Sequence, residues 1–419
     1  MNSGYKSSLE IFLVGTGLGI YTLSTAFHAL TGVRTTTITR TPIAAQKHSA
    51  SGAVIELGPT ASDADIVAEL LARARSREAE ALTAGRTPAK HLLLCNEDAL
   101  VEMFAKHRGS LEKYFVLPIP SDQALEAIVD KAEFAKLCAT NKVPAPRTEI
   151  VDFSCDPFPS PTKLEFPVVA KVAKASALLG LSIPEKKKVY FVRSQAELDQ
   201  VWTNHRDAAF TGRFVVQELI PGDDTAMWSL TLYRDKNGSV TLRASARVLL
   251  EEHTPEALGR PAAMLTQFDP DVLAQATRLL DAVDYRGFAN VDLKRDPKTG
   301  TLLFLEINPR IGRNNFYVTG AGANVAQFPL ADALHDTSLE CVDVKESILY
   351  SLVPMALLSR YVKDSALWTK VKRAARKGVK NPWVYGPDNP RAKLYSLAVA
   401  ANHIRKFQTH YPRPTQTGF

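Results

Sequence analysis

The first part of the chain alternates between short apolar runs and segments with helical periodicity. Three apolar runs predict buried strands, at residues 11–14, 35–39 and 92–95. Three segments with apolar residues three or four apart predict helices, at about residues 20–30, 63–82 and 98–107. An edge strand is expected near Phe115. This alternation favours a parallel sheet covered by helices, and predicts a Rossmann-like domain over residues 1–117.

The sequence pattern changes after a linker at residues 118–120. Ser121 or Asp122 is expected to cap a helix that runs towards Leu137, and the following segments are rich in β-branched and aromatic residues. These segments predict strands at residues 167–173, 188–192, 213–220, 229–235 and 239–251. A helix with Asp269 as its N-cap should cover residues 272–283. Two further strands are expected at residues 287–296 and 301–308, joined by a turn.

An uncharged stretch at residues 11–33 raises the alternative of a transmembrane helix or an uncleaved signal. Glycines at 15, 17 and 19 interrupt it, so we interpret it as a strand, a glycine turn and a helix. The turn is also similar to a dinucleotide-binding loop, but it lacks the last glycine of GxGxxG, and Arg40 stands where an acidic residue is expected. We therefore favour a Rossmann-like turn that contacts substrate over a cofactor site.

Composition excludes several classes of protein and places the positive charge at one end. With 45% hydrophobic and 23% charged residues, the chain is neither disordered nor fibrous, and four cysteines without CxxC spacing fit a reducing cytoplasm. The net charge of +7 divides into +11 for residues 360–419 and −4 for the rest. This basic, helical end is expected either to contact an anionic substrate or the inner membrane surface, or to present a solvated face. Nucleic acid is disfavoured, because the aromatic residues there are not interleaved with the charges.

Three oxygen-bearing side chains in the last two predicted strands are candidates for a metal site. Glu306 and Asn308 are two residues apart on a strand, so they share a face. Asp292 lies opposite Glu306 if paired residue numbers sum to 598, whereas an odd sum places it on the other face. Two carboxylates and an amide oxygen suit Mg²⁺. The alternative is an ordinary polar, solvent-facing side of a hairpin.

The order of the surrounding motifs resembles the ATP-grasp superfamily. A strand ending at Lys171 is followed by a lysine-rich turn, by the segment 217–224, by Asp292 and by Leu305-Glu-Ile-Asn-Pro-Arg310. The resemblance implies a mixed α/β and α+β architecture, in which an ATP-grasp core at residues 118–340 follows the Rossmann-like domain. It divides that core into a lid subdomain at about 150–215 and a central antiparallel sheet at about 216–335. A basic helical extension would occupy residues 341–419.

The same resemblance implies roles for individual residues. Lys131 and Lys171 would hold ATP phosphates, and Arg310 would stabilise charge on the γ-phosphate. The adenine would be recognised through Gln217, Glu218 and Ile220. Asp224, or else Asp223, would bind the ribose, and Asp292, Glu306 and Asn308 would hold Mg²⁺, in two ions. A glycine-poor loop departs from the family pattern, and Lys187 and Lys188 would supply charge there instead.

Further motifs resemble the D-aspartate ligase branch of these enzymes. They lie at residues 186–191, 313–317, 320–324, 380–385 and 402–406. The resemblance implies that ATP activates a carboxylate as an acyl phosphate, which is then attacked by the side-chain amine of a peptidoglycan precursor peptide, for instance a nucleotide-linked muropeptide. Arg313, Tyr317 and Asn324 would contact substrate. The alternatives are a ligase for small metabolites or dipeptides and a non-catalytic ATP sensor, and the acid and its stereochemistry stay open.

Overall fold

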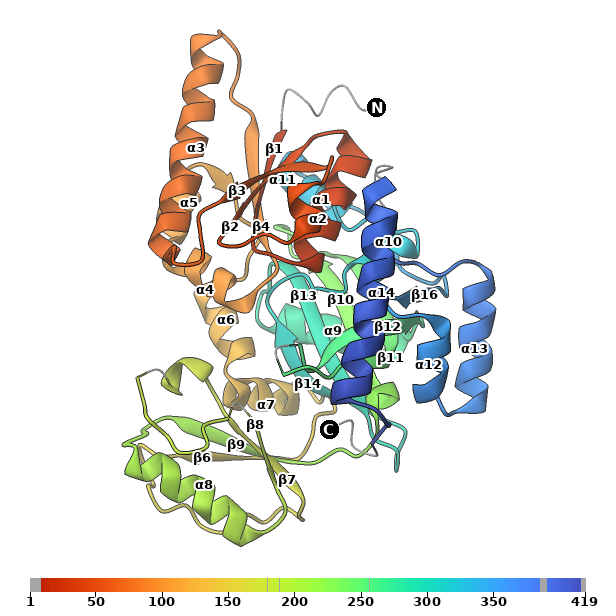
Figure 1. The fold of residues 1–419 in the computed structure, drawn as a ribbon. Coiled ribbons are helices and arrows are strands. Elements are labelled where there is room, and N and C mark those ends of the chain that lie inside the picture. The colour runs from red at the N-terminus through yellow and green to blue at the C-terminus, as the bar shows by residue number, and fades with distance from the viewer. Residues whose placement is uncertain (1–8, 179, 188, 256, 385–389, 416–419) are drawn as a thin grey trace.

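The computed structural model describes residues 9–178, 180–187, 189–255, 257–384 and 390–415, and the side chains of helix residues 390–397 and of Ala175 lie outside this description. Three sheets follow one another along the molecule (Figure 1). The N-terminal sheet lies at the top of the view, the large central sheet in the middle and a small four-stranded sheet at the bottom. The architecture is therefore a mixed α/β fold, as predicted.

The N-terminal sheet is parallel, with strand order β3-β2-β1-β4-β5, which confirms the predicted Rossmann-like pattern. Its strands are β1 (Leu9–Val14), β2 (Thr35–Thr39), β3 (Gly52–Glu56), β4 (Lys90–Cys95) and β5 (Phe115–Val116). Its helices are α1 (Leu18–Thr31), α2 (Ala44–Lys47), α3 (Asp63–Thr83), α4 (Asp98–Lys106) and α5 (Arg108–Leu111). Alternate residues of β1 pack into two separate cores, so helices cover both faces of the sheet. Among the described residues, no helix is both long and apolar enough to cross a membrane.

The helix predicted after Ser121 is two helices, and this corrects the sequence-based expectation. Ser121 caps α6 (Asp122–Val129), and α7 (Lys131–Thr140) begins after a break at Asp130. The Asp130 carboxylate accepts hydrogen bonds from the amides of Ala132 (2.9 Å) and Glu133 (3.2 Å). Its other oxygen pairs with Arg213 at 2.7 Å. The apolar pattern continues through the break, so only the capping interaction ends one helix and starts the next.

The small sheet packs one face against a helix and carries Lys171 on the other. It contains β6 (Thr148–Asp152), β7 (Val168–Val172), β8 (Val189–Val192) and β9 (Arg213–Glu218) in the order β6-β9-β7-β8, with α8 (Gln195–Asp207) packed beside it. Val168, Ala170 and Val172 enter the core shared with Trp202 of α8. Because strand side chains alternate, Lys171 points to the opposite face. Gln217, two residues from the Lys171 partner Val215, shares that face.

The central sheet carries the predicted metal hairpin at its edge. The strand order is β14-β13-β10-β11-β12-β16, with β15 (Val342–Asp343) paired to β11. The strands are β10 (Met227–Arg234), β11 (Val240–Glu252), β12 (Arg260–Thr266), β13 (Gly287–Arg295), β14 (Leu302–Asn308) and β16 (Leu349–Ser351). The helices around it are α9 (Pro270–Ala282), α10 (Phe316–Gly320) and α11 (Gln327–Leu334). Asp269 caps α9 through the Val272 amide at 3.2 Å, as predicted.

The C-terminal part of the chain is helical and packs on the central sheet. It contains α12 (Met355–Tyr361), α13 (Ser365–Arg376) and α14 (Pro390–His410). Figure 1 shows α14 running across the central sheet, from the N-terminal domain towards the bottom of the view. Ile404 and Phe407 of α14 pack with Leu358 and Val371 of the other two helices. The exposed basic side chains of α13 point away from this core, and their contact with an anionic surface stays a prediction.

Candidate active site

The hairpin of β13 and β14 brings three of the predicted site residues onto one face. Asp292 pairs with Glu306, and Asn290 pairs with Asn308, so paired numbers sum to 598 and the favourable register is confirmed. Directly opposite residues of an antiparallel pair point to the same side. The Asn308 side-chain nitrogen donates to Asp292 Oδ2 at 3.0 Å, and Asn290 donates to Asp292 Oδ1 at 3.2 Å. A bulge follows at once, because Leu293 pairs with Phe304.

The chemistry of these three side chains fits a hard divalent cation. Burial raises the pKa of Asp292 to about 7, the nearby Glu306 adds to this, and Arg310 opposes it. Over the described part of the chain, no group of three or more His, Cys, Asp and Glu side chains could hold a metal. Asn308 directs its nitrogen at Asp292, which leaves its oxygen as the third donor. Two carboxylates and an amide oxygen match the preference of Mg²⁺.

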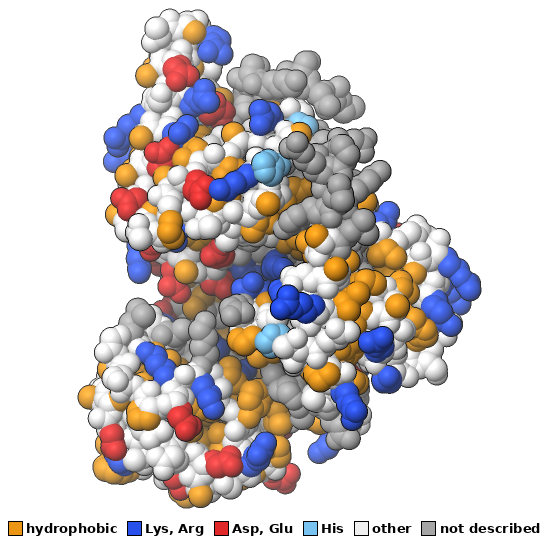
Figure 2. Space-filling view, in the orientation of Figure 1, with side chains coloured by type: hydrophobic (Ala, Val, Ile, Leu, Met, Phe, Trp, Pro, Cys, Tyr) orange, Lys and Arg blue, Asp and Glu red, His pale blue; other side chains and the backbone are white. Residues whose placement is uncertain are grey.

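Lysines from the small sheet and from α7 face this hairpin. Burial lowers the pKa of Lys171, the negative charge of Glu306 opposes that shift, and Lys131 adds to it. The three side chains are therefore close enough to interact, although they come from three separate segments. Lys131 is the first residue of α7, and its amide donates to the Ala173 carbonyl at 3.2 Å. Figure 2 shows the surface hollowed between the small sheet and the rest of the molecule, with charged side chains along the hollow.

The segment predicted to recognise adenine borders the same face. The buried Gln217 donates to the Thr148 hydroxyl at 3.0 Å. The Glu218 carboxylate is held by Arg147, whose Nε lies 2.8 Å from Oε2. Ile220 follows the end of β9, and no described group accepts a hydrogen bond from its amide. Their contact with adenine stays a prediction, and Arg147 is an organising residue that the sequence did not single out.

The ribose assignment to Asp224 conflicts with its surroundings. Asp224 is buried, and its Oδ2 already accepts from the Glu251 amide and from His253 Nε2, each at 2.9 Å. Asp223 is only half-buried and bonds locally to the hydroxyl of Thr225 at 2.6 Å. The geometry thus reverses the preference between the two carboxylates, because Asp224 supports β11 from inside the fold.

The lysines of the glycine-poor loop have unequal positions. Lys187 is exposed, and its amide donates to the Tyr190 hydroxyl at 2.9 Å. Lys188 lies outside the described residues. Lys186, which the sequence did not single out, donates to the carbonyls of Leu178 (2.7 Å) and Leu181 (3.2 Å) and so holds the loop closed on itself. Phosphate contact by Lys187 stays a prediction.

Arg310 joins the central sheet to the N-terminal domain. Its Nε lies 3.2 Å from Oδ1 of Asp98, the first residue of α4. Arg310 also lowers the pKa of Asp292, so one guanidinium lies close to both carboxylates. Asp98 belongs to this site although it is 212 residues away in sequence, and no local pattern could have indicated it.

Of the three predicted substrate residues, Arg313 and Asn324 are half-buried, whereas Tyr317 is fully buried. The Arg313 side chain is 29% exposed and pairs with Glu252 at 2.8 Å. Tyr317 lies in the core, with its hydroxyl 3.4 Å from the Ala244 carbonyl, which corrects the expectation that it contacts substrate. Asn324 donates to the Ala26 carbonyl of α1 at 3.0 Å. Substrate contact by Arg313 and Asn324 stays a prediction.

Comparison with known proteins finds similarity to ATP-dependent enzymes. Residues 130–331 match the family model described as the ATP-binding domain of the carbamoyl-phosphate synthase L chain. The sequence is 25% identical over 373 residues to a D-aspartate ligase of Enterococcus faecium (strain Aus0004), covering 87% of each chain. Residues 130–331 therefore resemble an ATP-binding domain, and the similarity to the D-aspartate ligase extends over most of the chain.

Solved structures show the same fold at low sequence identity. An L-amino acid ligase from Bacillus licheniformis superposes with a TM-score of 0.54 at 14% identity, covering 80% of this chain and 76% of that chain. An N5-carboxyaminoimidazole synthetase from Staphylococcus aureus gives a TM-score of 0.55 at 13% identity, with 82% of each chain covered. At such identities the similarity supports the fold alone.

The buried Glu251 predicts how the stability of the protein depends on pH. Burial, then Asp224 and Asp292, raises the pKa of Glu251 to about 8, and Lys294 opposes this. The folded-state pKa is above the unfolded value of about 4.3. The stability that this group contributes is therefore complete below that value and is lost as pH rises through about 8. We expect Glu251→Gln to raise the thermal midpoint by several degrees at pH 8.5 and by little at pH 5.

Thermal unfolding of wild type and variant at both pH values, in one buffer system, provides the measurement. The exposed Glu197→Gln serves as the matched control and should leave the midpoint unchanged at either pH. A Glu251→Gln protein that is less stable at pH 8.5 would instead mean that Glu251 is ionised and paired with Lys294.

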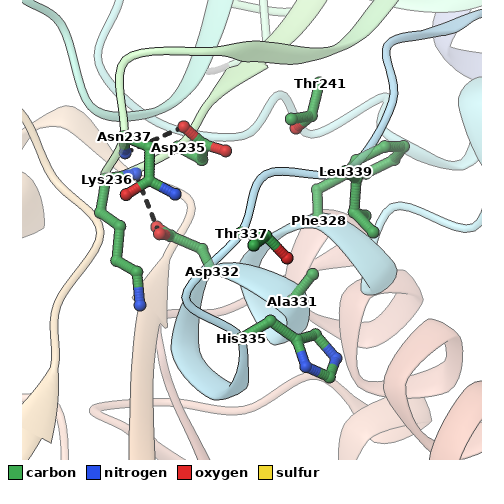
Figure 3. Close-up of a pocket in the computed structure, with 10 residues that line it drawn as sticks. All are labelled: Asp235, Lys236, Asn237, Thr241, Phe328, Ala331, Asp332, His335, Thr337 and Leu339. Atoms are coloured by element: carbon green, nitrogen blue, oxygen red, sulfur yellow. Dashed lines mark hydrogen bonds between the residues drawn. The ribbon is translucent and has the colours of Figure 1, made fainter.

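A second pocket on the protein surface is formed by the residues that anchor a hairpin turn. It lies between the turn joining β10 to β11 and helix α11, and Figure 3 shows its lining. Asp332 accepts from the Lys236 amide at 2.9 Å and from the Tyr233 hydroxyl at 2.8 Å. Asp235 accepts from the Asn237 amide at 3.0 Å. These carboxylates are satisfied by the turn itself, so the hollow is part of the hairpin anchor.

Proposed function

We propose that the protein is an ATP-dependent ligase of the ATP-grasp superfamily, and that it joins a carboxylate of D-aspartate to the side-chain amine of a peptidoglycan precursor peptide. The observation that carries the proposal is the extent of the similarity to the D-aspartate ligase of E. faecium. It covers 87% of both chains, and so extends well beyond residues 130–331, which match the general nucleotide-binding model. Regions outside the nucleotide site are the ones that distinguish ATP-grasp ligases with different substrates.

In the proposed reaction, ATP lies between the face of the small sheet that carries Lys171 and the hairpin of β13 and β14. Lys131 and Lys171 bind the phosphates, and Asp223 binds the ribose hydroxyls. Asp292, Glu306 and Asn308 would hold Mg²⁺, which when bound neutralises phosphate charge. A carboxylate oxygen of the amino acid attacks the γ-phosphorus, the bond to the ADP oxygen breaks, and Arg310 stabilises the charge on the transferred phosphoryl group.

The second step forms the amide. The amine nitrogen attacks the carbonyl carbon of the acyl phosphate, the C–O bond to phosphate breaks, and the nitrogen loses a proton to solvent. The reaction needs no nucleophilic side chain, because the amine is the nucleophile and phosphate is the leaving group. It does need protection from water, since acyl phosphates hydrolyse. The loop over residues 174–187, which Lys186 holds together, covers that side of the cleft in this proposal.

A substrate panel tests the proposal. The complete protein is incubated with ATP and Mg²⁺, and ADP release is measured with D-aspartate, L-aspartate or D-glutamate, with and without a nucleotide-linked muropeptide that contains lysine. We expect ADP only with D-aspartate together with the acceptor, and a product whose mass equals the two substrates minus water. ADP formation from pairs of free amino acids without the muropeptide would instead assign the protein to dipeptide-forming ligases.

A further inference from the structure

A pocket that the proposed reaction does not use lies where helix α14 crosses the end of β11. Six residues line it, three from the end of β11 and the residues after it and three from α14: Glu252, His253, Thr254, His403, Lys406 and Phe407. The enclosed part of the pocket measures only about 10 Å³, room for about one water molecule, and the rest of its about 200 Å³ is open to solvent, so a larger ligand would lie at its mouth. The C-terminal helix therefore does more than cover the sheet, because half of this lining comes from it.

An ion pair with unused hydrogen-bonding groups lies at the pocket. Arg313 donates from Nη1 to Glu252 Oε1 at 2.8 Å, and the Glu252 side chain is only 5% exposed. In the described part of the chain, Arg313 has no other hydrogen-bond partner. His403 is 5% exposed, and its Nδ1 has no partner there either; the same holds for the hydroxyl of the fully buried Tyr350.

Of the two unpartnered groups, His403 lines the pocket together with Glu252, whereas Tyr350 does not line it. Burial raises the pKa of Tyr350 and lowers that of His403, and the charges of both Arg313 and Glu252 also act on each of them. Lys406 acts on His403 as well. Buried polar groups in native proteins almost always have partners, so two unsatisfied ones beside one ion pair indicate a site that a ligand completes.

This site adjoins the reaction centre. Arg313 is three residues after Arg310 on the loop that follows β14, and Arg310 lies beside Asp292. Arg313 also packs against the start of α1, since a Cβ on Gly19 would lie 2.9 Å from Arg313 Cα. Helix α1 has no acidic residue in its first turn and no side-chain cap, so its positive end faces this loop. The surroundings therefore suit a carboxylate bound next to Arg313.

We propose that this pocket binds the head group of the amino acid that the enzyme activates. Arg313 and Lys406 bind its α-carboxylate, Glu252 binds its α-ammonium, and His403 supplies a neutral hydrogen bond that fixes its orientation. The side-chain carboxylate then extends along the loop towards Arg310. This inference rests on the proposed function, in which an amino acid is phosphorylated on its side chain. It makes α14 a substrate-binding element.

The test compares Lys406→Met with Arg405→Met, which removes an exposed charge from the adjacent position of the same helix. Steady-state ADP formation is measured while D-aspartate is varied at saturating ATP and acceptor, and then while ATP is varied. Loss of one charge-assisted hydrogen bond should raise the KM for D-aspartate about ten- to hundredfold in Lys406→Met and leave the KM for ATP unchanged. Arg405→Met should match the wild type in both.

Substrate analogues separate binding from folding. β-Alanine is D-aspartate without its α-carboxylate, and succinate is D-aspartate without its ammonium. Wild type should prefer D-aspartate to both analogues. Lys406→Met should reduce the preference for D-aspartate over β-alanine and leave the preference over succinate unchanged. Glu252→Gln should reduce the preference for D-aspartate over succinate and leave the preference over β-alanine unchanged. Thermal midpoints show whether a variant is folded. If Lys406→Met or Glu252→Gln does not fold, His403→Asn is measured in its place. Equal KM values for D-aspartate in Lys406→Met and Arg405→Met would overturn the inference.

Failure of the proposed function gives a different result. If ADP forms only with another acid, D-aspartate is not the substrate, and the same variants are compared with that acid and with its analogue that lacks the α-carboxylate. An unchanged preference in Lys406→Met would overturn the inference there too. If the activated acid has no amino-acid head group, the inference is wrong.

Discussion

Replacing Glu306 by Gln should reduce Mg²⁺-dependent ADP formation at least about a hundredfold while the protein stays folded. Glu306 lies directly opposite Asp292, and the amide of Asn308 completes the set. The glutamine has the same shape but removes one of the two negative charges that a divalent cation needs. Asp292→Asn should have a similar effect, because both oxygens of Asp292 are already oriented by Asn290 and Asn308.

The measurement is ADP release over a range of Mg²⁺ concentrations, together with the midpoint of thermal unfolding. We expect the Mg²⁺ concentration for half-maximal rate to rise sharply in both variants. Asp271→Asn, which removes an exposed carboxylate from the first turn of α9, is the matched control and should behave as wild type. Full activity of Glu306→Gln at unchanged Mg²⁺ dependence would exclude the hairpin as the metal site, and would favour the alternative of a polar outer face.

Arg310→Ala should lower kcat by about a hundred- to a thousandfold and change ATP affinity little. Arg310 pairs with Asp98 and lowers the pKa of Asp292. In the proposed reaction, negative charge develops beside its guanidinium only as the phosphoryl group is transferred. An interaction made mainly in the transition state appears in kcat rather than in ground-state binding. Arg310→Lys should recover part of the loss, because it restores the charge without the two-pronged geometry.

Two comparisons show whether Arg310 acts on the reaction or only joins the domains. Asp98→Asn breaks the contact between α4 and Arg310 but keeps the guanidinium, so it should cost far less than Arg310→Ala. Arg278→Ala removes an exposed arginine from α9 and should have no effect. The kcat and the ATP affinity of both variants are measured, the affinity by calorimetry. If Asp98→Asn and Arg310→Ala lose equal amounts of kcat and of ATP affinity, Arg310 only joins the two domains.

Local patterns predicted the strands and helices well where local chemistry decides them. The cap residues Ser121 and Asp269 and four of the five parallel strands of the N-terminal domain follow directly from periodicity and turn residues, whereas β3 was not predicted. Strand β12 was not predicted, because Arg260–Thr266 contains few β-branched residues and is a strand through pairing with β11 and β16. The break at Asp130 was also missed, since it depends on a distant Arg213.

The candidate site was predictable in its residue types but not in its geometry. Sequence left open whether Asp292 and Glu306 share a face, because the register of a hairpin depends on its turn and on any bulge. Asp98 could not be found, since its partner Arg310 is distant in the chain. Tyr317 illustrates the opposite limit: a motif similar to that of a ligase branch does not separate residues that bind substrate from residues that pack beneath it.

All three candidate metal ligands belong to a single hairpin, whereas Lys171 belongs to a different sheet. Any rotation of the small sheet about its connections would carry Lys171 and the adenine segment away from the hairpin, but Asp292, Glu306 and Asn308 would keep their mutual positions, because ladder hydrogen bonds join their two strands. The candidate cation site is thus contained in one hairpin, whereas the proposed triphosphate site also needs Lys171 from the small sheet.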